Sequence, residues 1–448
     1  MTTSFKDQAV AVLGAGESGL AAASLLQEAG AIVTVLDSAE ENTLRHKIDA
    51  LGLRGIRVKT GAAAERDADE YALTVLSPGI DPSTALVQNF LGKRCELIGE
   101  LELAYSMCAC PIVAITGTNG KTTTTQLLEQ MLNACGVKTV ASGNIGPAFS
   151  AKVSKSPELD VMTLEVSSFQ LERILKFRPQ IAVWLGFAPD HLDRYRSMAE
   201  YFQAKLRIFE NQTAEDWAIV NFRDRLPQLA ARRITFSAYV RGADFELRDG
   251  VIFYQDRAVL RMSDTQLRGA HNAENLMAAL GVGVVKGLSF EHMTSALCLY
   301  QPLPHRCEIL GEVNGVEWVN DSKGTNLDSV EKALLSENRP VVLIAGGKDK
   351  GFEYDLLREL VGQKCRSAVL LGEMADRIEG MWGAQLPCQN AGRSLERAVE
   401  LAAAAAQPGD VVLFSPGTSS FDMFKNYADR GNQFRALVSA LPRNPTIQ

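Results

Sequence analysis

A glycine-rich loop in the first third of the chain carries the residue types that cradle a phosphate group. Its sequence is Thr116-Gly117-Thr118-Asn119-Gly120-Lys121-Thr122-Thr123. The loop follows the apolar run 111–115 and precedes a helix-like segment, 122–135. Glycines let backbone N–H groups approach an anion, and a helix N-terminus favours negative charge. Lys121 can reach the outer phosphates and the Thr122 hydroxyl can ligate Mg²⁺, so we expect the chain to consume ATP.

This loop is shorter than the common phosphate-binding pattern, which has a glycine where Ile115 stands. The chain enters the loop at Gly117 instead. The alternative is a glycine turn without a ligand. We favour the phosphate site because strand, lysine, threonine and helix are all in place.

A second glycine turn, G-x-G-x-x-G over 14–19, follows the apolar run 9–13. Asp37 closes the next apolar run, 32–36, where an acidic residue can bind ribose hydroxyls. The pattern is typical of a dinucleotide site, although a tight strand-to-helix turn without a ligand would look the same. It does not say which nucleotide binds.

Three further side chains are ambiguous when each is considered alone. Glu165 ends the strand-like run 161–164, where a carboxylate commonly ligates Mg²⁺ but is also common as an exposed charge. His191 lies between two aspartates and could be a base, a metal ligand or a surface residue. Lys205 sits in a helix-like run and by itself reads as an ordinary lysine. The polar run 320–326 favours a ligand loop.

The length of 448 residues predicts about three domains. Short apolar strands alternate with helices in each third, so we expect an α/β fold with doubly wound parallel sheets. The predicted domains are a Rossmann-like domain at 1–108, a central ATPase-like parallel sheet at 109–304 and a Rossmann-like domain at 305–448. Within the second, 231–267 reads as a small antiparallel patch.

Composition excludes some partners. The net charge of −7 gives no support for a nucleic-acid partner. No run of about 18 apolar residues or signal peptide is evident, so we expect neither a membrane span nor export but a cytoplasmic protein. The eight cysteines include no CxxC pair; Cys108 and Cys110 are closest, and reduced thiols are the simplest interpretation.

Together these pieces resemble the Mur ligase family, the ATP-dependent amide ligases of peptidoglycan precursor synthesis. The motifs that carry the resemblance are 117–123, 165–170, 190–195, Lys205, 271–275, 305–306 and 320–326. Within the family, four features are most similar to the members that add D-glutamate to UDP-N-acetylmuramoyl-L-alanine: 14–19 with 77–79, 142–146, 320–326, and 415–417 with 420–426. Another Mur ligase or a folylpolyglutamate-type ligase is the alternative.

The resemblance implies roles for named residues. ATP would meet Gly117, Thr118, Asn119, Gly120, Lys121, Thr122, Thr123, Asn275, Arg306 and Asp321. The UDP-substrate would meet Gly14, Gly16, Ser18, Gly19, Asp37, Ser77, Asn144 and His191. D-Glutamate would meet Lys323, Thr325, Lys350, Ser420 and Tyr427. Two Mg²⁺ ions would be held by Thr122, Glu165, His191 and Lys205, the last as a carbamate. The catalytic residues would be Lys121, His191, Lys205 and Lys323.

The implied reaction passes through an acyl phosphate, which must be shielded from water. We therefore expect the third domain to close over the second, with a hinge near 303–305. We also expect the protein to be a monomer. Three positions depart from the family pattern: Gly186 replaces an asparagine, Tyr427 a phenylalanine and Gly324 an alanine.

The sequence leaves two other functions open. An NAD-dependent oxidoreductase would leave the phosphate loop unexplained, and a nucleotide-driven switch would leave the polar loops of 305–448 unused.

Overall fold

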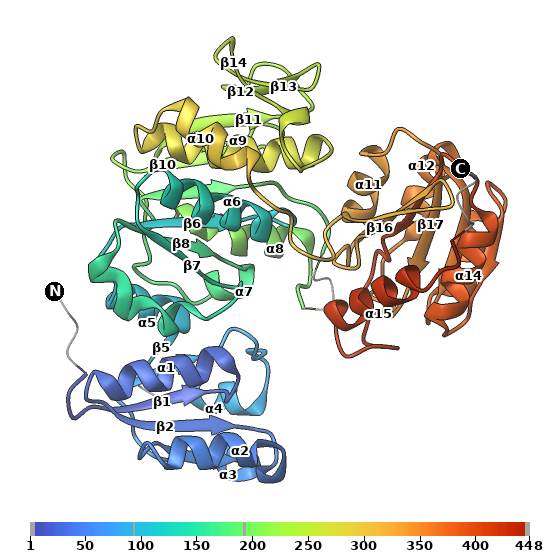
Figure 1. Ribbon diagram of the computed structural model, residues 1–448. Coiled ribbons are helices and arrows are strands. Elements are labelled where there is room, and N and C mark those ends of the chain that lie inside the picture. The colour runs from blue at the N-terminus through green and yellow to red at the C-terminus, as the bar shows by residue number, and fades with distance from the viewer. Residues whose placement is uncertain (1–4, 93–94, 191–193, 444–448) are drawn as a thin grey trace.

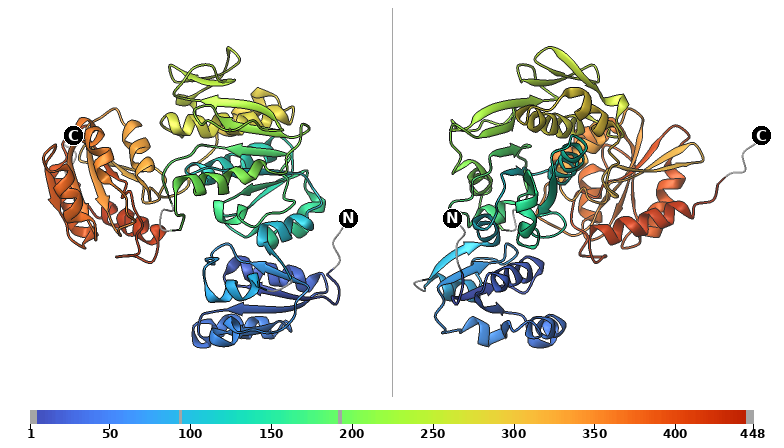
Figure 2. Two further views of the ribbon diagram at one scale, coloured as in Figure 1. Left: turned by 180° about the vertical axis from the view of Figure 1, so that it is seen from behind. Right: turned by 60° about the vertical axis from the view of Figure 1, so that its left-hand side comes forward.

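A computed structural model describes residues 5–92, 95–190 and 194–443. Each third of the chain builds one lobe around its own β-sheet (Figure 1). Views from two other sides show the N-terminal and C-terminal lobes each next to the central lobe (Figure 2). None of the helices in the described ranges is both long and apolar enough to cross a membrane.

The N-terminal lobe contains a five-stranded parallel sheet of order β3-β2-β1-β4-β5. Its strands are β1 (Ala9–Leu13), β2 (Ile32–Asp37), β3 (Arg57–Thr60), β4 (Leu73–Leu76) and β5 (Glu96–Gly99). Its helices are α1 (Glu17–Glu28), α2 (Glu41–Gly52), α3 (Gly61–Glu65), α4 (Ala85–Leu91) and α5 (Glu100–Ser106). The strand β1 is apolar throughout and β4 is apolar except for Thr74, because apolar side chains pack on both faces of the sheet.

The central lobe contains a nine-stranded sheet of order β14-β13-β12-β11-β10-β9-β6-β8-β7. Its strands are β6 (Ile112–Thr116), β7 (Thr139–Gly143), β8 (Val161–Glu165), β9 (Ile181–Trp184), β10 (Trp217–Asn221), β11 (Arg232–Ser237), β12 (Phe245–Arg248), β13 (Val251–Tyr254) and β14 (Arg257–Arg261). Its helices are α6 (Lys121–Ala134), α7 (Ser168–Leu171), α8 (Met198–Leu206), α9 (Ala270–Val285) and α10 (Phe290–Cys298).

The predicted antiparallel patch at 231–267 was partly wrong. β11 pairs in parallel with β10 and again with β12, and only β12, β13 and β14 pair antiparallel. The patch extends the main sheet because Ile234 and Phe236 of β11 pack into the core beneath α9. Residues 222–231 connect β10 to β11 without a helix, and they carry the chain back so that β11 runs in the same direction as β10. Turn signals alone could not reveal that crossover.

The C-terminal lobe contains a six-stranded sheet of order β15-β16-β20-β17-β18-β19, parallel except for the edge strand β15. Its strands are β15 (Glu308–Val313), β16 (Val316–Asn320), β17 (Val341–Gly346), β18 (Cys365–Leu371), β19 (Cys388–Asn390) and β20 (Val411–Phe414). Its helices are α11 (Leu327–Leu335), α12 (Arg358–Lys364), α13 (Ala375–Trp382), α14 (Leu395–Ala405) and α15 (Tyr427–Ser439). The predicted three-sheet α/β fold is confirmed; the exact domain boundaries stay predictions.

The apolar cores show how the lobes are joined. One continuous core includes Val10 and Val12 of the N-terminal sheet, α5, and one face of the central sheet. A second core lies between the other face of that sheet and α6, α9 and α10. The C-terminal lobe has two cores of its own, one on each face of its sheet. Hydrophobic packing therefore joins the first two lobes, and the third meets them through other contacts.

Candidate active site

The phosphate loop lies between the end of β6 and the start of α6. Gly117 has φ +152° and Gly120 has φ +85°, which side chains with a Cβ rarely adopt. A Cβ on Gly120 would also lie 2.3 Å from Asn275 Oδ1. These two positions need glycine so that the loop can turn and so that α9 can approach it.

A cavity of about 280 Å³ opens between this loop and the C-terminal lobe. Fourteen of the sequence-predicted site residues line it: Thr118, Asn119, Gly120, Lys121, Thr122, Thr123, Asn144, Glu165, Asn275, Arg306, Asp321, Lys323, Thr325 and Lys350. The structure thus brings together most of the residues predicted for ATP, metal and D-glutamate; of the described ones, Gly117, Lys205, Ser420 and Tyr427 do not line the cavity.

Two lysines support the phosphate loop from different sides. Lys121 Nζ donates to the carbonyl oxygens of Gly117 and Thr118, both at 2.9 Å. Lys205 Nζ donates to the same Gly117 oxygen at 2.7 Å, but Lys205 is buried behind the loop and does not line the cavity. Burial lowers the pKa of both amines, and the nearby Lys121 charge lowers the pKa of Lys205 further.

The carboxylate of Glu165 has one buried oxygen that could bind a cation. Its Oε1 accepts a 2.7 Å hydrogen bond from Asn144 Nδ2, while no described residue hydrogen-bonds its buried Oε2. This unpartnered anionic oxygen fits the oxygen ligands that Mg²⁺ prefers, and Glu165 and Thr122 line the same cavity at the phosphate loop. The described residues hold no group of three His, Cys, Asp or Glu that could bind a metal unaided.

The C-terminal lobe contributes cations to the cavity wall. Burial lowers the pKa of Lys323 to about 8, and the Arg306 charge adds to that shift. Its Nζ lies 4.0 Å from the centre of the Tyr427 ring, a cation–π contact. Lys350 Nζ lies 3.6 Å from Asp190 Oδ1 of the central lobe. Burial raises the pKa of Asp321 to about 6, although Ser415 donates to it at 2.7 Å.

Two residues predicted for D-glutamate do not line this cavity. Ser420 is buried in the loop after β20, and the ring of Tyr427 contacts Lys323, which lines the cavity. His191 was predicted as a catalytic, metal and substrate residue, and it lies outside the described residues.

The residues predicted for the nucleotide of the UDP-substrate lie apart from the cavity, in the N-terminal lobe. Gly14, Gly16, Ser18 and Gly19 form the turn between β1 and α1, and Ser77 follows β4. Asp37 supports the turn: its carboxylate accepts from the N–H groups of Ala15 at 2.7 Å and Ala39 at 2.8 Å. A Cβ on Gly19 would lie 1.9 Å from the Gly14 carbonyl oxygen, so the close packing requires glycine.

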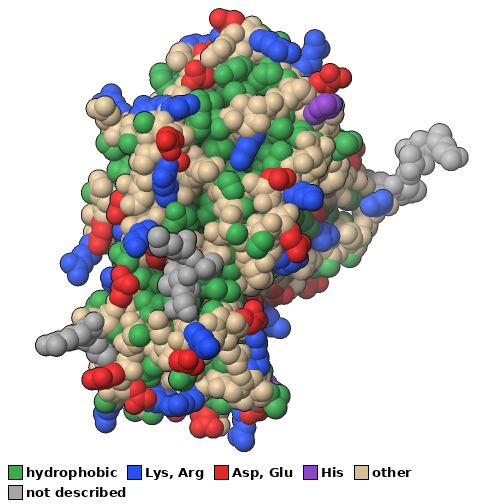
Figure 3. Space-filling model, turned by 90° about the vertical axis from the view of Figure 1, so that its left-hand side faces the viewer, with side chains coloured by type: hydrophobic (Ala, Val, Ile, Leu, Met, Phe, Trp, Pro, Cys, Tyr) green, Lys and Arg blue, Asp and Glu red, His purple; other side chains and the backbone are tan. Residues whose placement is uncertain are grey.

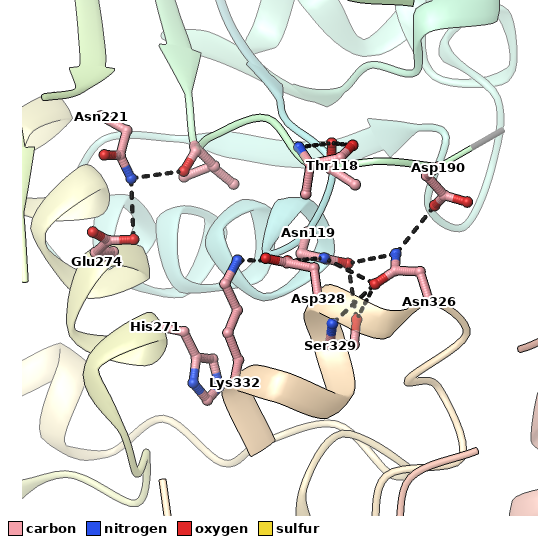
Figure 4. Close-up of polar contacts among 12 residues, drawn as sticks. Thr118, Asn119, Asp190, Asn221, His271, Glu274, Asn326, Asp328, Ser329 and Lys332 are labelled. Carbon is pink, nitrogen blue, oxygen red and sulfur yellow. Dashed lines mark hydrogen bonds and ion pairs between the residues drawn. The ribbon is translucent and has the colours of Figure 1, made fainter. Parts of the chain in front are cut away.

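A polar clasp joins the phosphate loop to α11 of the C-terminal lobe (Figure 4). The side chains of Asn119 and Asn326 exchange two hydrogen bonds of 3.2 Å. Asn119 also donates to Asp328 and accepts from Ser329 at 3.1 Å. Asn326 donates to Asp190 at 3.1 Å. These contacts hold the third lobe at the mouth of the phosphate site.

Sequence reasoning missed most of this clasp. Asn326 was quoted only as part of a polar run, and Asp328 and Ser329 were not singled out. The available signal was the position of Asn326, whose side chain caps α11 by accepting from the Ser329 N–H at 2.9 Å. Tyr300 and Lys332 on the cavity wall were also missed, and His271 was quoted only within the motif 271–275, without a role.

Removing the Asn119 side chain should lower the catalytic efficiency with ATP. Asn119→Ala deletes several hydrogen bonds between lobes, each contributing about 0.5–1.5 kcal/mol. We expect kcat/KM for ATP to fall about 5- to 100-fold with little change in Tm. Ser329→Ala removes fewer of these bonds and should cause a smaller loss. A larger loss for Ser329→Ala than for Asn119→Ala would contradict this ranking.

Comparison with known proteins agrees with this architecture. The chain matches the family profiles described as "Mur ligase MurD-like, N-terminal domain" at 8–99, "Mur ligase middle domain" at 115–283 and "Mur ligase, glutamate ligase domain" at 305–417. It is 41% identical over 441 residues to the UDP-N-acetylmuramoylalanine–D-glutamate ligase of Geotalea uraniireducens, covering 96% of this chain and 97% of that protein. The same-named protein of Koribacter versatilis is 40% identical, covering 96% of each chain.

Solved structures show the same fold at low sequence identity. The UDP-N-acetylmuramate–alanine ligase of Thermotoga maritima matches with a TM-score of 0.61 and 16% identity, over 97% of this chain and 99% of that one. MurF from Acinetobacter baumannii matches with a TM-score of 0.62 and 16% identity, over 90% of each chain. A parallel sheet bearing a phosphate loop, flanked by two further α/β lobes, defines a class of three-lobed nucleotide-binding proteins. Within that class, the chain belongs to the Mur ligase family.

Proposed function

We propose that this chain joins the amine of D-glutamate to the carboxyl of UDP-N-acetylmuramoyl-L-alanine, with cleavage of ATP to ADP and phosphate, in peptidoglycan precursor synthesis. The observation that carries the proposal is the match of 40–41% identity along nearly the whole chain to ligases of that name. The fold neighbours act on other substrates and support only the architecture.

The residues of the phosphate loop act on the phosphoryl group by position and charge. The substrate carboxylate attacks the γ-phosphate of ATP, which gives an acyl phosphate and ADP. Backbone N–H groups at the start of α6 and the Lys121 ammonium stabilise the negative charge on the transferring group. Asn275, Arg306 and Asp321 hold the nucleotide from the junction between lobes, where all three line the cavity.

Thr122 and Glu165 would hold one Mg²⁺, which neutralises phosphate charge when bound. A second ion would use His191 and Lys205. Lys205 suits that role only as a carbamate, which replaces a cation by anionic oxygens. Its buried amine, with a pKa well below the usual value, favours the neutral form that can react with carbon dioxide.

The D-glutamate amine then attacks the acyl carbonyl, and phosphate leaves. Lys323, Thr325 and Lys350 present hydrogen-bond donors to the carboxylates of the amino acid, with Ser420 and Tyr427 behind them. The N-terminal glycine turn holds the uridine nucleotide, with Asp37 and Ser77 beside it. Asn144 and His191 meet the diphosphate and sugar. The clasp between Asn119 and Asn326 keeps the third lobe over the acyl phosphate and limits its hydrolysis.

We further infer a cytoplasmic enzyme that works as a monomer. Charges of both signs are interspersed over the face drawn in Figure 3, which gives no uniform basic surface for a nucleic acid. Residues 1–108, 109–304 and 305–448 are the three domains that this function requires.

A substrate panel tests the proposal directly. The protein is mixed with ATP, Mg²⁺ and UDP-N-acetylmuramoyl-L-alanine, and phosphate release is recorded with each candidate amino acid. D-Glutamate should drive release, and L-glutamate, L-alanine and a diamino acid should not. Release driven by another amino acid would identify another Mur ligase, and release with a folate acceptor and L-glutamate would identify the folylpolyglutamate alternative.

Lys323→Ala should impair use of D-glutamate more than use of ATP. A hydrogen bond to a charged group is worth about 1.5–3 kcal/mol, so we expect the KM for D-glutamate to rise about 10- to 100-fold. The KM for ATP should change much less. The reverse ranking would mean that Lys323 faces the nucleotide.

The lowered pKa of Lys323 predicts a pH dependence. Below pH about 8 the amine is protonated and attracts a carboxylate, and above that pH it becomes neutral. Arginine stays charged over this range, so Lys323→Arg serves as the control. The ratio of kcat/KM for D-glutamate in the wild type to that in Lys323→Arg should fall as pH rises from 7 to 9.5. A flat ratio would show that the Lys323 charge does not bind this substrate.

A further inference from the structure

Two cysteines flank one exposed residue in the connector between the first two lobes. Cys108 and Cys110 lie on either side of Ala109, in the link from α5 to β6. Figure 1 shows α5 where the N-terminal lobe meets the central one. Both cysteines are half-buried against the core that these lobes share. The strand that follows leads into the phosphate loop.

The geometry of this connector brings the two sulfur atoms together. Cys108 Sγ lies 4.0 Å from Cys110 Sγ and donates to the Cys110 carbonyl oxygen at 3.3 Å. Ser156 Oγ accepts from the Ala109 N–H at 2.9 Å and so anchors the turn. A disulfide needs the sulfurs about 2 Å apart, so they must approach each other by about 2 Å.

The surroundings of the two thiols shift their pKa values in opposite directions, and thiol–disulfide exchange needs one thiol that ionises readily. The hydrogen bond from the Cys110 thiol, helped by the Cys110 N–H and the Ser156 hydroxyl, lowers the pKa of Cys108 to about 7. The same donation raises the pKa of Cys110. Burial instead raises the pKa of five cysteines elsewhere: Cys135, Cys298, Cys307, Cys365 and Cys388. Cys108 is thus placed as the attacking thiolate and Cys110 as the resolving thiol.

We propose that Cys108 and Cys110 form a redox modification site that reacts with low-molecular-weight disulfides and closes into a disulfide within the connector between the first two lobes. The Cys108 thiolate attacks one sulfur of the small disulfide, whose S–S bond breaks, and the released thiolate takes a proton from water. Cys110 then loses its proton to water and attacks Cys108 Sγ. The second small thiol leaves as a thiolate and is protonated. Two protein thiols are oxidised and one small disulfide is reduced to two thiols.

Exposure of the full chain to defined ratios of oxidised and reduced glutathione tests the site. Remaining thiols are alkylated after an acid quench, and peptides are analysed by mass spectrometry. Trypsin leaves Cys95, Cys108 and Cys110 on one peptide, 95–121. Fragment-ion spectra of this peptide must therefore show which of the three cysteines is modified. The peptide mass should show the loss of two hydrogens at Cys108 and Cys110, as a disulfide requires, while the other six cysteines stay reduced and become alkylated. Dithiothreitol should restore both thiols.

Single variants separate the two roles. Cys110→Ser should stop at a mixed disulfide of Cys108 with glutathione. Cys108→Ser should leave Cys110 at least about tenfold less reactive, because its thiol is mainly protonated. Cys95→Ser is the matched control on the same peptide and should behave as the wild type. The proposal is overturned if other cysteines oxidise at lower ratios than this pair, or if Cys110→Ser gives no adduct at Cys108.

Discussion

Lys121→Ala is expected to lower ADP release by about 10³-fold, the upper range for loss of one preorganised charge-stabilising group. Lys121 is held at the phosphate loop by its bonds to two loop carbonyl oxygens, and it would exchange these short-range bonds for bonds to the phosphate oxygens. Burial lowers the pKa of this amine in the free protein, and phosphate anions would favour the charged form again. Single-turnover measurement of ADP release should report the loss.

Binding of the UDP-sugar should survive in this variant, because the predicted nucleotide turn lies in another lobe. Isothermal titration with the UDP-substrate measures that binding separately. Lys176→Ala, on an exposed surface of the central lobe, is the matched control and should retain full turnover. Turnover within a few-fold of the wild type in Lys121→Ala would refute the role of the cradle lysine.

Lys205→Ala is expected to reduce activity by about 10²-fold or more, as for loss of a group that orients a metal site. The reason is position: Lys205 is buried directly behind the loop, where its Nζ contacts the Gly117 carbonyl. If the working group is a carbamate, a short-chain carboxylate such as formate or acetate should partly restore phosphate release by supplying the missing oxygens. The measurement is phosphate release across a carboxylate titration.

Lys121→Ala provides the control for this rescue, because a carboxylate cannot replace an ammonium. It should stay inactive at every carboxylate concentration. Thermal unfolding must show that Lys205→Ala is folded, since the substitution also removes a contact of 4.8 Å between the amine and the Tyr201 ring. Full activity of Lys205→Ala without added carboxylate would eliminate the carbamate.

The activity losses expected for Lys121→Ala and Lys205→Ala arise from contacts with very different sequence separations. The Lys121 bonds span three and four residues, and a motif of eight residues encodes them. The Lys205 bond spans 88 residues, and a lysine in an ordinary amphipathic helix gives no sign of it. The resemblance to a family identified Lys205; its spacing did not.

The sequence by itself determined the local features: the strands, the two glycine turns and the phosphate loop. These depend on positive φ angles, buried apolar runs and helix starts, which neighbouring residues specify. It also determined the three-sheet α/β class, because apolar strands alternating with helices leave few other arrangements.

Only the tertiary structure decided which distant groups share a cavity. Asn119 meets Asn326 across 207 residues, and β11 lies parallel to β12 although the intervening turn resembles a hairpin. It also decided that Glu165 keeps one oxygen unpartnered among the described residues and that Cys108 and Cys110 face each other. Such outcomes depend on how whole lobes pack, and packing energy is summed over many contacts far apart in the chain. No local spacing of residue types can encode that sum.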